Sequence, residues 1–289
     1  MARLLTIAAA QTAGVEQPGS DAIVAAAHAM LDEAGKQRVR LLTFGELFLA
    51  PFFANRLEQD FDRYFMRVDD PIIAGLIDKA RELRVAMVLP IAERATAGYF
   101  NTALVIDDTG REIGRYRKTH IPAYFPNAQP GGTGSYEKFY FTPGGALNVF
   151  NIAGTTIGVQ ICNDRLFPEA SRVLALRGAE VLVMPICFST YSDPVQRAAI
   201  WEVPLRARAY ENGAFVLASN RVGVEGPRHH LGRSMIVDPT GTILREAGTD
   251  AQELLVAEID LDDVAAARKR FPWWRDRRPE LYDALAHVG

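Results

Sequence analysis

Short apolar runs alternate with longer amphipathic runs from one end of the chain to the other. Continuous apolar runs of about four to eight residues are typical of buried strands, and apolar residues three and four apart are typical of helices. The turn Asp107–Gly110 separates two apolar runs and predicts a hairpin. In the first half, this reasoning predicts strands at residues 4–11, 41–44, 85–92, 102–107 and 112–117, and helices at 21–37 and 71–83.

The second half continues the same alternation. Pro168 suits the first turn of a helix, where a missing N–H costs nothing. Pro204 falls inside a later helical run and is expected to kink or restart that helix. The expected strands are 155–161, 180–186, 214–219, 234–237, 243–245 and 254–259, and the expected helices are 168–177 and 194–211.

Strand–helix–strand units mixed with hairpins predict an α/β protein, with a mixed sheet and helices outside it. The many strands favour two sheets packed face to face, although periodicity alone does not distinguish this from a single doubly wound sheet. The chain has no internal repeat and no Gly/Ser/Pro-rich linker, and residues 127–135 are expected to form a loop. We therefore expect one domain over residues 1–289.

Composition and charge narrow the class of protein. The 289 residues are 48% hydrophobic and 23% charged, as in ordinary globular proteins. The 32 basic and 35 acidic residues give a net charge of -3, so neither nucleic acid nor a membrane surface is expected as a partner. Two cysteines, no signal peptide and no apolar run of about 18 residues predict a cytoplasmic location.

Reactive side chains follow several of the predicted strands, and ligands in α/β folds bind beyond strand ends. Glu46 follows the strand at 41–44, and desolvation by its apolar neighbours would suit a general base. Lys118 ends a hairpin strand, with His120 two residues later, and a buried lysine there would stabilise an oxyanion. The alternatives are a carboxylate that points to solvent and an ordinary surface cation.

Cys162 lies between an apolar strand and the helix predicted from Pro168. Such a junction exposes a nucleophile and offers backbone N–H groups to an oxyanion, and a thiolate needs no metal to react. The alternative is a buried core cysteine. Cys187 also follows an apolar strand, but no helix comes next, and we interpret it as a packing or pocket-wall residue.

Metal and nucleotide cofactors have no support in the sequence. None of the five histidines stands at zinc-ligand spacing from a cysteine or another histidine. His229 and His230 are adjacent and would point to opposite faces of a strand. No glycine-rich phosphate-binding motif follows the first strand.

Taken together and in this order, these segments resemble the nitrilase superfamily of carbon–nitrogen hydrolases. The matching residues are Glu46 in TFGELF, Lys118 in YRKTHIP and Cys162 in GVQICNDRLFPEASR, and the resemblance extends over residues 4–260. It implies a four-layer α-β-β-α sandwich with no metal or organic cofactor. It also implies a homodimer or homotetramer, in which the tail 260–289 contacts a neighbouring subunit.

The resemblance assigns a role to each matching residue. Glu46 would be the general base, Cys162 the nucleophile, and Lys118 with the backbone N–H of Asn163 would hold the oxyanion. Glu137 in SYEKFYFTPG matches a second glutamate that assists in the family. Gly45 stands where the family usually has proline.

Two details point toward enzymes that act on N-carbamoyl compounds. KTHIP and YEKFYFTPG resemble N-carbamoylputrescine amidases and β-ureidopropionases, and ICNDRLFPEASR resembles N-carbamoyl-D-amino-acid hydrolases. In the latter, an arginine after Cys-Asn-Asp binds the substrate carboxylate, and Arg165 matches it. The alternative for Arg165 is an ion pair with Glu169 or Asp164. Leu166 replaces a second arginine, and Cys187-Phe188 replaces Asn-Thr. The residues expected near the substrate are thus Arg165, Asn163, His120 and Cys187.

The expected function is hydrolysis of a small N-carbamoyl amino acid or N-carbamoyl amine through a cysteine thioester. An aliphatic amidase, an ω-amidase and a nitrilase are the alternatives within the same chemistry. A non-catalytic binding or scaffold protein on the same fold is the alternative from another class.

Overall fold

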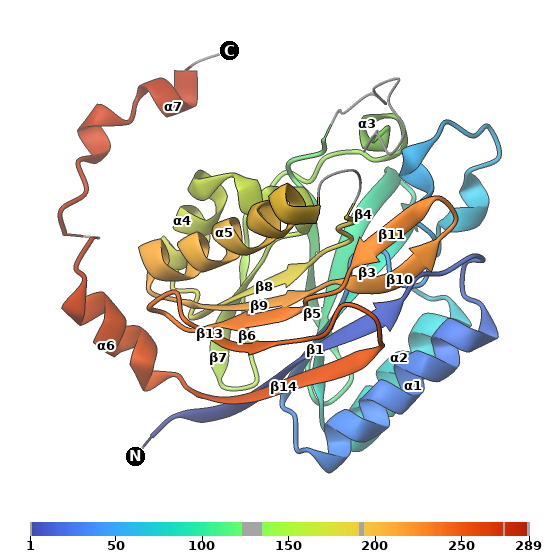
Figure 1. Cartoon of the computed structure of the whole chain (residues 1–289), viewed down its shortest axis with the longest axis horizontal. Coiled ribbons are helices and arrows are strands. Elements are labelled where there is room, and N and C mark those ends of the chain that lie inside the picture. Colours follow the sequence, from blue (N-terminus) through green and yellow to red (C-terminus); the bar gives the residue numbers. More distant parts are fainter. Residues whose placement is uncertain (1, 123–134, 191–193, 274, 288–289) are drawn as a thin grey trace.

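The computed structural model describes residues 2–122, 135–190, 194–273 and 275–287. Two β-sheets lie face to face, and helices cover the outer face of each (Figure 1). The predicted four-layer α-β-β-α sandwich is therefore confirmed, and a single doubly wound sheet is excluded. Residues 127–134 of the expected loop lie outside the described residues.

The first sheet brings the ends of β2 and β5 to the same edge. β2 and β3 are parallel, β4 is antiparallel to β3, and β5 is antiparallel to β4, so β2 and β5 run in one direction. Glu46 and Lys118 directly follow these two strands. In the described residues the strand order is β11 (Arg228–Leu231), β10 (Arg221–Glu225), β1 (Leu4–Ala13), β2 (Leu41–Phe44), β3 (Ala86–Ala95), β4 (Gly98–Ile106) and β5 (Glu112–Arg117), with β14 (Glu253–Asp260) also paired to β1.

The second sheet brings the two segments that carry the cysteines to one edge. β7, β8 and β9 are parallel, so the segments after β7 and β8 meet at one edge. Cys162 follows β7, and Cys187 follows β8. In the described residues the strand order is β13 (Ile243–Glu246), β12 (Met235–Val237), β9 (Phe215–Ser219), β8 (Val181–Pro185), β7 (Thr155–Val159) and β6 (Val149–Ile152).

Three apolar cores hold the four layers together. The central core lies between the sheets and includes Ile157, Val159 and Ile161, the residues whose alternation predicted a shared buried face. A second core joins the first sheet to α1 (Asp21–Lys36) and α2 (Pro71–Leu83). A third joins the other sheet to α4 (Pro168–Leu176) and α5 (Pro194–Asn212). Each layer is thus fixed by burial on at least one face.

Pro204 lies inside α5. The helix continues through this residue and does not restart, and a kink at this position stays a prediction. Trp201 and Leu205 on either side are fully buried in the third core. Burying two large side chains contributes about 3–6 kcal/mol, which offsets the cost of about 3 kcal/mol for a proline inside a helix.

Several elements were not predicted. They are short or polar, so their periodicity is weak. They are the strands β6, β10 and β11, the helices α3 (Glu137–Tyr140), α6 (Asp262–Arg270) and α7 (Ala284–His287), and the 3₁₀ turns Phe53–Asn55, Asp62–Tyr64, Cys162–Leu166 and Pro279–Leu281.

After β14 the chain leaves the sandwich, and α6 and α7 run along one side of it (Figure 1). A contact of this tail with a neighbouring subunit stays a prediction. Of the helices in the described ranges, none has the length and apolar character needed to cross a membrane.

Candidate active site

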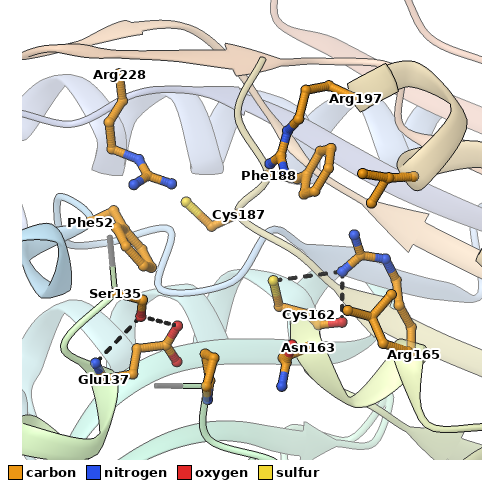
Figure 2. Close-up of a pocket in the computed structure, with 13 residues that line it drawn as sticks. Phe52, Ser135, Glu137, Cys162, Asn163, Arg165, Cys187, Phe188, Arg197 and Arg228 are labelled. Carbon is orange, nitrogen blue, oxygen red and sulfur yellow. Dashed lines mark hydrogen bonds between the residues drawn. The ribbon is translucent and has the colours of Figure 1, made fainter. Parts of the chain in front are cut away.

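A cavity of about 340 Å³ lies where β7 and β8 end (Figure 2). Of the residues singled out in the sequence, Glu137, Cys162, Asn163, Arg165 and Cys187 line its wall. Glu46 and Lys118 lie behind the wall, where both are fully buried. His120 does not belong to the described lining.

Lys118 joins two carboxylates at the base of the cavity. Its Nζ donates to Glu46 Oε1 at 2.8 Å and to Glu137 Oε2 at 2.6 Å. Burial disfavours the ammonium, but Glu137 and Glu46 outweigh burial and hold the pKa of Lys118 well above its usual value. Burial raises the pKa of Glu137, and the nearby negative charge of Glu46 adds to that effect against the attraction of Lys118. Lys118 balances the charge of one carboxylate, so the other can act as a base toward a thiol.

Two further donors hold the Glu46 carboxylate in place. Asn101 Nδ2 donates to Oε1 at 2.7 Å, and the backbone N–H of Cys187 donates to Oε2 at 3.1 Å. The second bond crosses from one sheet to the other. It therefore fixes the Glu46 carboxylate relative to the strands that precede the two cysteines. A general base must lie within hydrogen-bond reach of the proton that it takes.

The loop after Glu46 is clamped by a buried ion pair. Arg221 Nη2 donates to the carbonyl oxygens of Glu46 at 3.0 Å and Ala50 at 2.7 Å. Arg221 Nη1 donates to Glu225 Oε2 at 2.6 Å. Leu47 in the same loop has a φ of 53°, which costs about 1 kcal/mol for a non-glycine residue. The clamp holds this strained backbone and so keeps Glu46 on the cavity side.

Cys162 sits on a strained turn between β7 and α4. Its φ is 48°, in the left-handed region that residues other than glycine rarely adopt. Arg165 Nη1 donates to the Cys162 carbonyl oxygen at 2.7 Å and lies 3.8 Å from its Sγ. Burial and the charge of Glu46 raise the pKa of the Cys162 thiol to about 11, although Lys118 and Arg165 oppose them. At neutral pH the cysteine is a thiol, so it needs a base before it can attack.

Asp164 ties this turn to the segment that follows Lys118. Its carboxylate accepts from Ile161 N at 2.8 Å and Tyr116 Oη at 2.8 Å, and from His120 N at 2.9 Å. Burial and the negative charge of Asp164 raise the pKa of Tyr116. Asp164 therefore aligns the two segments that bring Lys118 and Cys162 together.

The structure gives His120 and Arg165 contacts that differ from those expected. The His120 ring pairs with Asp164 Oδ1 at 2.8 Å and stacks on Phe167 at 4.1 Å. Its expected binding role stays a prediction. Among the described residues, Arg165 forms no ion pair with Glu169 or Asp164. It contacts Cys162 instead. Its carboxylate-binding role stays a prediction.

Cys187 lines the cavity, as expected of a pocket-wall residue. Its Sγ lies 3.9 Å from His230 Nδ1, and burial raises the pKa of the thiol to about 12. His230 is buried and His229 is exposed, so the two do point to opposite faces of β11. The described residues contain no group of three His, Cys, Asp or Glu side chains placed to hold a metal ion.

Sequence reasoning missed the residues that position the site. Asn101 stood one residue before a predicted strand, and Arg221 one residue after an asparagine that was not assigned to any element. Asp164 was considered only as a partner for Arg165. Polar residues inside or beside apolar strands are the signal that marks them, since such groups need partners when buried.

Comparisons with known proteins identify the family of this chain. The family model for carbon-nitrogen hydrolases matches residues 6–269. An N-carbamoylputrescine amidase of Solanum tuberosum is 34% identical over 98% of this chain and 95% of its own. A citrullinase of Francisella tularensis is 32% identical over 88% of both chains.

A solved structure supports the same assignment. The crystal structure of a carbon-nitrogen hydrolase from Helicobacter pylori G27 superposes with a TM-score of 0.87 at 29% identity, covering 98% of each chain. The resemblance to the nitrilase superfamily is thereby confirmed. The chain belongs to the carbon–nitrogen hydrolase family and hydrolyses carbon–nitrogen bonds other than peptide bonds.

Proposed function

We propose that this hydrolase cleaves N-carbamoyl compounds, with Cys162 as nucleophile and Glu46 as general base. The observation that carries the proposal is the buried chain from Glu46 through Lys118 to Glu137, whose last member lines the same cavity as Cys162. A carboxylate, a cation and a thiol at one cavity are the groups that acyl transfer through a thioester requires.

The first half of the reaction forms a covalent intermediate. Glu46 takes the proton of the Cys162 thiol, and the sulfur attacks the carbamoyl carbon. Lys118 and the backbone N–H of Asn163 stabilise the oxyanion of the tetrahedral intermediate. The C–N bond then breaks, and the departing nitrogen takes the proton held by Glu46. Glu137 orients Lys118 through their 2.6 Å hydrogen bond.

In the second half, Glu46 takes a proton from water, and the resulting hydroxide attacks the thioester carbon. The sulfur leaves and recovers its proton. The acid released is a carbamic acid, which breaks down to carbon dioxide and the remaining amino compound. Overall, one N-carbamoyl compound and one water yield an amine, carbon dioxide and ammonia. A positioned base contributes about 10²–10⁴ in rate, and an oxyanion donor about 10²–10³.

The names of two relatives support a carbamoyl substrate. N-carbamoylputrescine amidase and citrullinase both refer to compounds that carry a ureido group. An ω-amidase reaction is the second candidate, because a yeast relative of that name is 26% identical over 99% of this chain.

A product assay tests the proposal. Purified protein is incubated with N-carbamoyl amino acids, N-carbamoyl amines, ω-amides and nitriles, and both ammonia and carbon dioxide are measured, with Cys162→Ala as the blank. Release of carbon dioxide and ammonia in equal amounts supports a carbamoyl substrate. Ammonia alone, from an amide or a nitrile, would contradict it.

We also propose a cytoplasmic homodimer or homotetramer. Large apolar side chains are exposed on α4 and α5 and in the tail, where Leu176 is 46%, Val203 63% and Leu285 67% accessible in the single chain. Such a surface favours burial against another subunit. Light scattering coupled to size-exclusion chromatography tests the assembly, and a monomer at micromolar concentration would contradict it.

A further inference from the structure

The described cavity wall carries more positive than negative charge. Three arginines, Arg165, Arg197 and Arg228, line it, and Glu137 is the one carboxylate among the described lining residues. Glu137 is already bonded to Lys118. Because three guanidinium groups surround a small volume, the cavity attracts an anionic ligand and repels a cationic one.

Arg228 faces the part of the cavity away from the reacting groups. It belongs to β11, whereas Cys162 and Arg165 belong to the turn after β7. Figure 2 shows the Arg228 guanidinium directed into the cavity, near Cys187 and Phe52 and separate from the Cys162 turn. Arg228 can therefore contact a part of the substrate other than the carbamoyl group that Cys162 attacks.

The Arg228 guanidinium is held in a defined plane. Its centre lies 4.1 Å from the Phe52 ring, and its Nη2 donates to Ser189 Oγ at 3.1 Å. The side chain is 5% exposed, so its interactions with a ligand are weakly screened. A planar, oriented guanidinium is suited to bind a carboxylate by donating two parallel hydrogen bonds to it.

The other two arginines have positions that suit other tasks. Arg165 donates to the backbone of Cys162 and acts on the nucleophile. Arg197 stacks on Phe188 at 3.7 Å and donates through Nε to the Ser189 carbonyl oxygen. Both add to the positive charge of the wall, and Arg228 is the one whose position matches the far end of a substrate.

We propose that the cavity takes N-carbamoyl substrates with a carboxylate at the far end, and that Arg228 binds this carboxylate. The inference rests on the proposed function and narrows it from N-carbamoyl compounds in general to ureido acids. An N-carbamoyl amine with a terminal ammonium would place like charges together in a desolvated space, which costs affinity.

Three ureido compounds of similar length test the charge preference. They are 4-ureidobutyrate, butylurea and N-carbamoylputrescine, whose far ends are anionic, neutral and cationic. The wild type is expected to release ammonia with kcat/KM highest for the acid and lowest for the ammonium compound. A preference for the ammonium compound would overturn the proposal.

Variants of Arg228 test whether this residue causes the preference for an anionic substrate. In Arg228→Gln, the ratio of kcat/KM for 4-ureidobutyrate to that for butylurea should fall about 10–100-fold, since a hydrogen bond to a charged group contributes about 1.5–3 kcal/mol. Arg228→Lys should keep part of the ratio, because it keeps the charge and loses the planar fork. The ratio cancels any general loss of folded enzyme, and an unchanged ratio in Arg228→Gln would overturn the proposal.

A matched control and a binding measurement complete the design. Arg245→Gln removes one exposed arginine of β13 and should leave the ratio unchanged. Calorimetric titration of Cys162→Ala, alone and combined with Arg228→Gln, reports binding of the same compounds without turnover. If the wild type hydrolyses none of them but Cys162→Ala binds the acid through Arg228, only the proposed function fails. Turnover without a charge preference overturns only the carboxylate site, and absence of both turnover and binding overturns both.

Discussion

Cys162 and Cys187 follow two neighbouring parallel strands, and yet their surroundings differ. Each follows an apolar strand of the second sheet, each lines the same cavity, and each is a free thiol. Both thiols have a raised pKa, about 11 for Cys162 and about 12 for Cys187, because the surrounding protein desolvates them, although Cys162 is half-buried and Cys187 is buried. A raised pKa therefore does not distinguish the nucleophile from the wall residue.

The two cysteines differ in which charges act on them and in what their backbone does. Glu46, Lys118 and Arg165 act on Cys162, whose φ of 48° places it on a strained turn. Arg221, Arg228 and Glu225 act on Cys187, with a smaller contribution from Glu46, which accepts the Cys187 backbone N–H. The comparison teaches that charged groups from distant strands, and not the local strand-end motif, make one thiol a candidate nucleophile.

The largest expected effect separates the two thiols directly. Cys162→Ala should abolish ammonia release, because no sulfur remains to form the thioester. Cys187→Ala should retain most turnover, because its contribution to Glu46 is a backbone N–H that alanine keeps. Ammonia release by each purified variant, with folding checked by circular dichroism, measures both. Equal loss in two folded variants would assign the chemistry to the wrong cysteine.

Glu46→Gln should act in opposite directions on two reactions of Cys162. Hydrolysis should fall about 10²–10⁴-fold, since the general base is lost. The negative charge of Glu46 raises the pKa of the Cys162 thiol, so its removal should lower that pKa. Alkylation of Cys162 by iodoacetamide at pH 8, followed by peptide mass spectrometry, should therefore become faster. A slower alkylation would contradict this charge effect and would show that Glu46 acts on the thiol as a base in this reaction too.

Glu225→Gln should affect stability more than chemistry, because the charges around Cys187 clamp a loop. Glu225 accepts from Arg221 at 2.6 Å and from the backbone N–H groups of Val15 and Phe52. Removing one partner of a buried ion pair costs about 3–5 kcal/mol of unfolding free energy, which denaturant titration measures.

The pH dependence of that loss has a definite sign. Despite burial, Arg221 and His230 hold the pKa of Glu225 below its usual value. A carboxylate with a lowered folded-state pKa stabilises the protein above its unfolded pKa of about 4.3, and this contribution is lost as pH falls. The difference in unfolding free energy between wild type and Glu225→Gln should thus shrink in acid. A difference that grows in acid would contradict the clamp.

The smallest expected effect concerns the resting thiols. With a pKa of about 11, only about one Cys162 in a thousand is a thiolate at pH 8. The rate of alkylation at Cys162 should therefore keep rising above pH 9, where an ordinary cysteine approaches its plateau, and Cys187 should react more slowly at each pH. A plateau at Cys162 below pH 9 would mean that the cations outweigh burial.

Local periodicity sufficed for most of the elements that frame the site. The apolar runs at 41–44, 112–117 and 180–186 correspond to β2, β5 and β8 within one residue at each end. The positions of Glu46, Lys118 and Cys162 just after strands could be predicted for the same reason, because strand length and burial are recorded in about four to eight consecutive residues. Pro204 shows the limit, since packing of Trp201 and Leu205 overrides a local rule.

Residue patterns thus specify the strands, the helices and the reactive side chains at their ends. Only the packing of the two sheets brings Glu46 within reach of the Cys187 backbone and directs Arg228 into the same cavity. The reason is that these contacts join residues up to 141 positions apart. Their geometry depends on strand order and on the burial of whole faces, which no short segment of sequence contains.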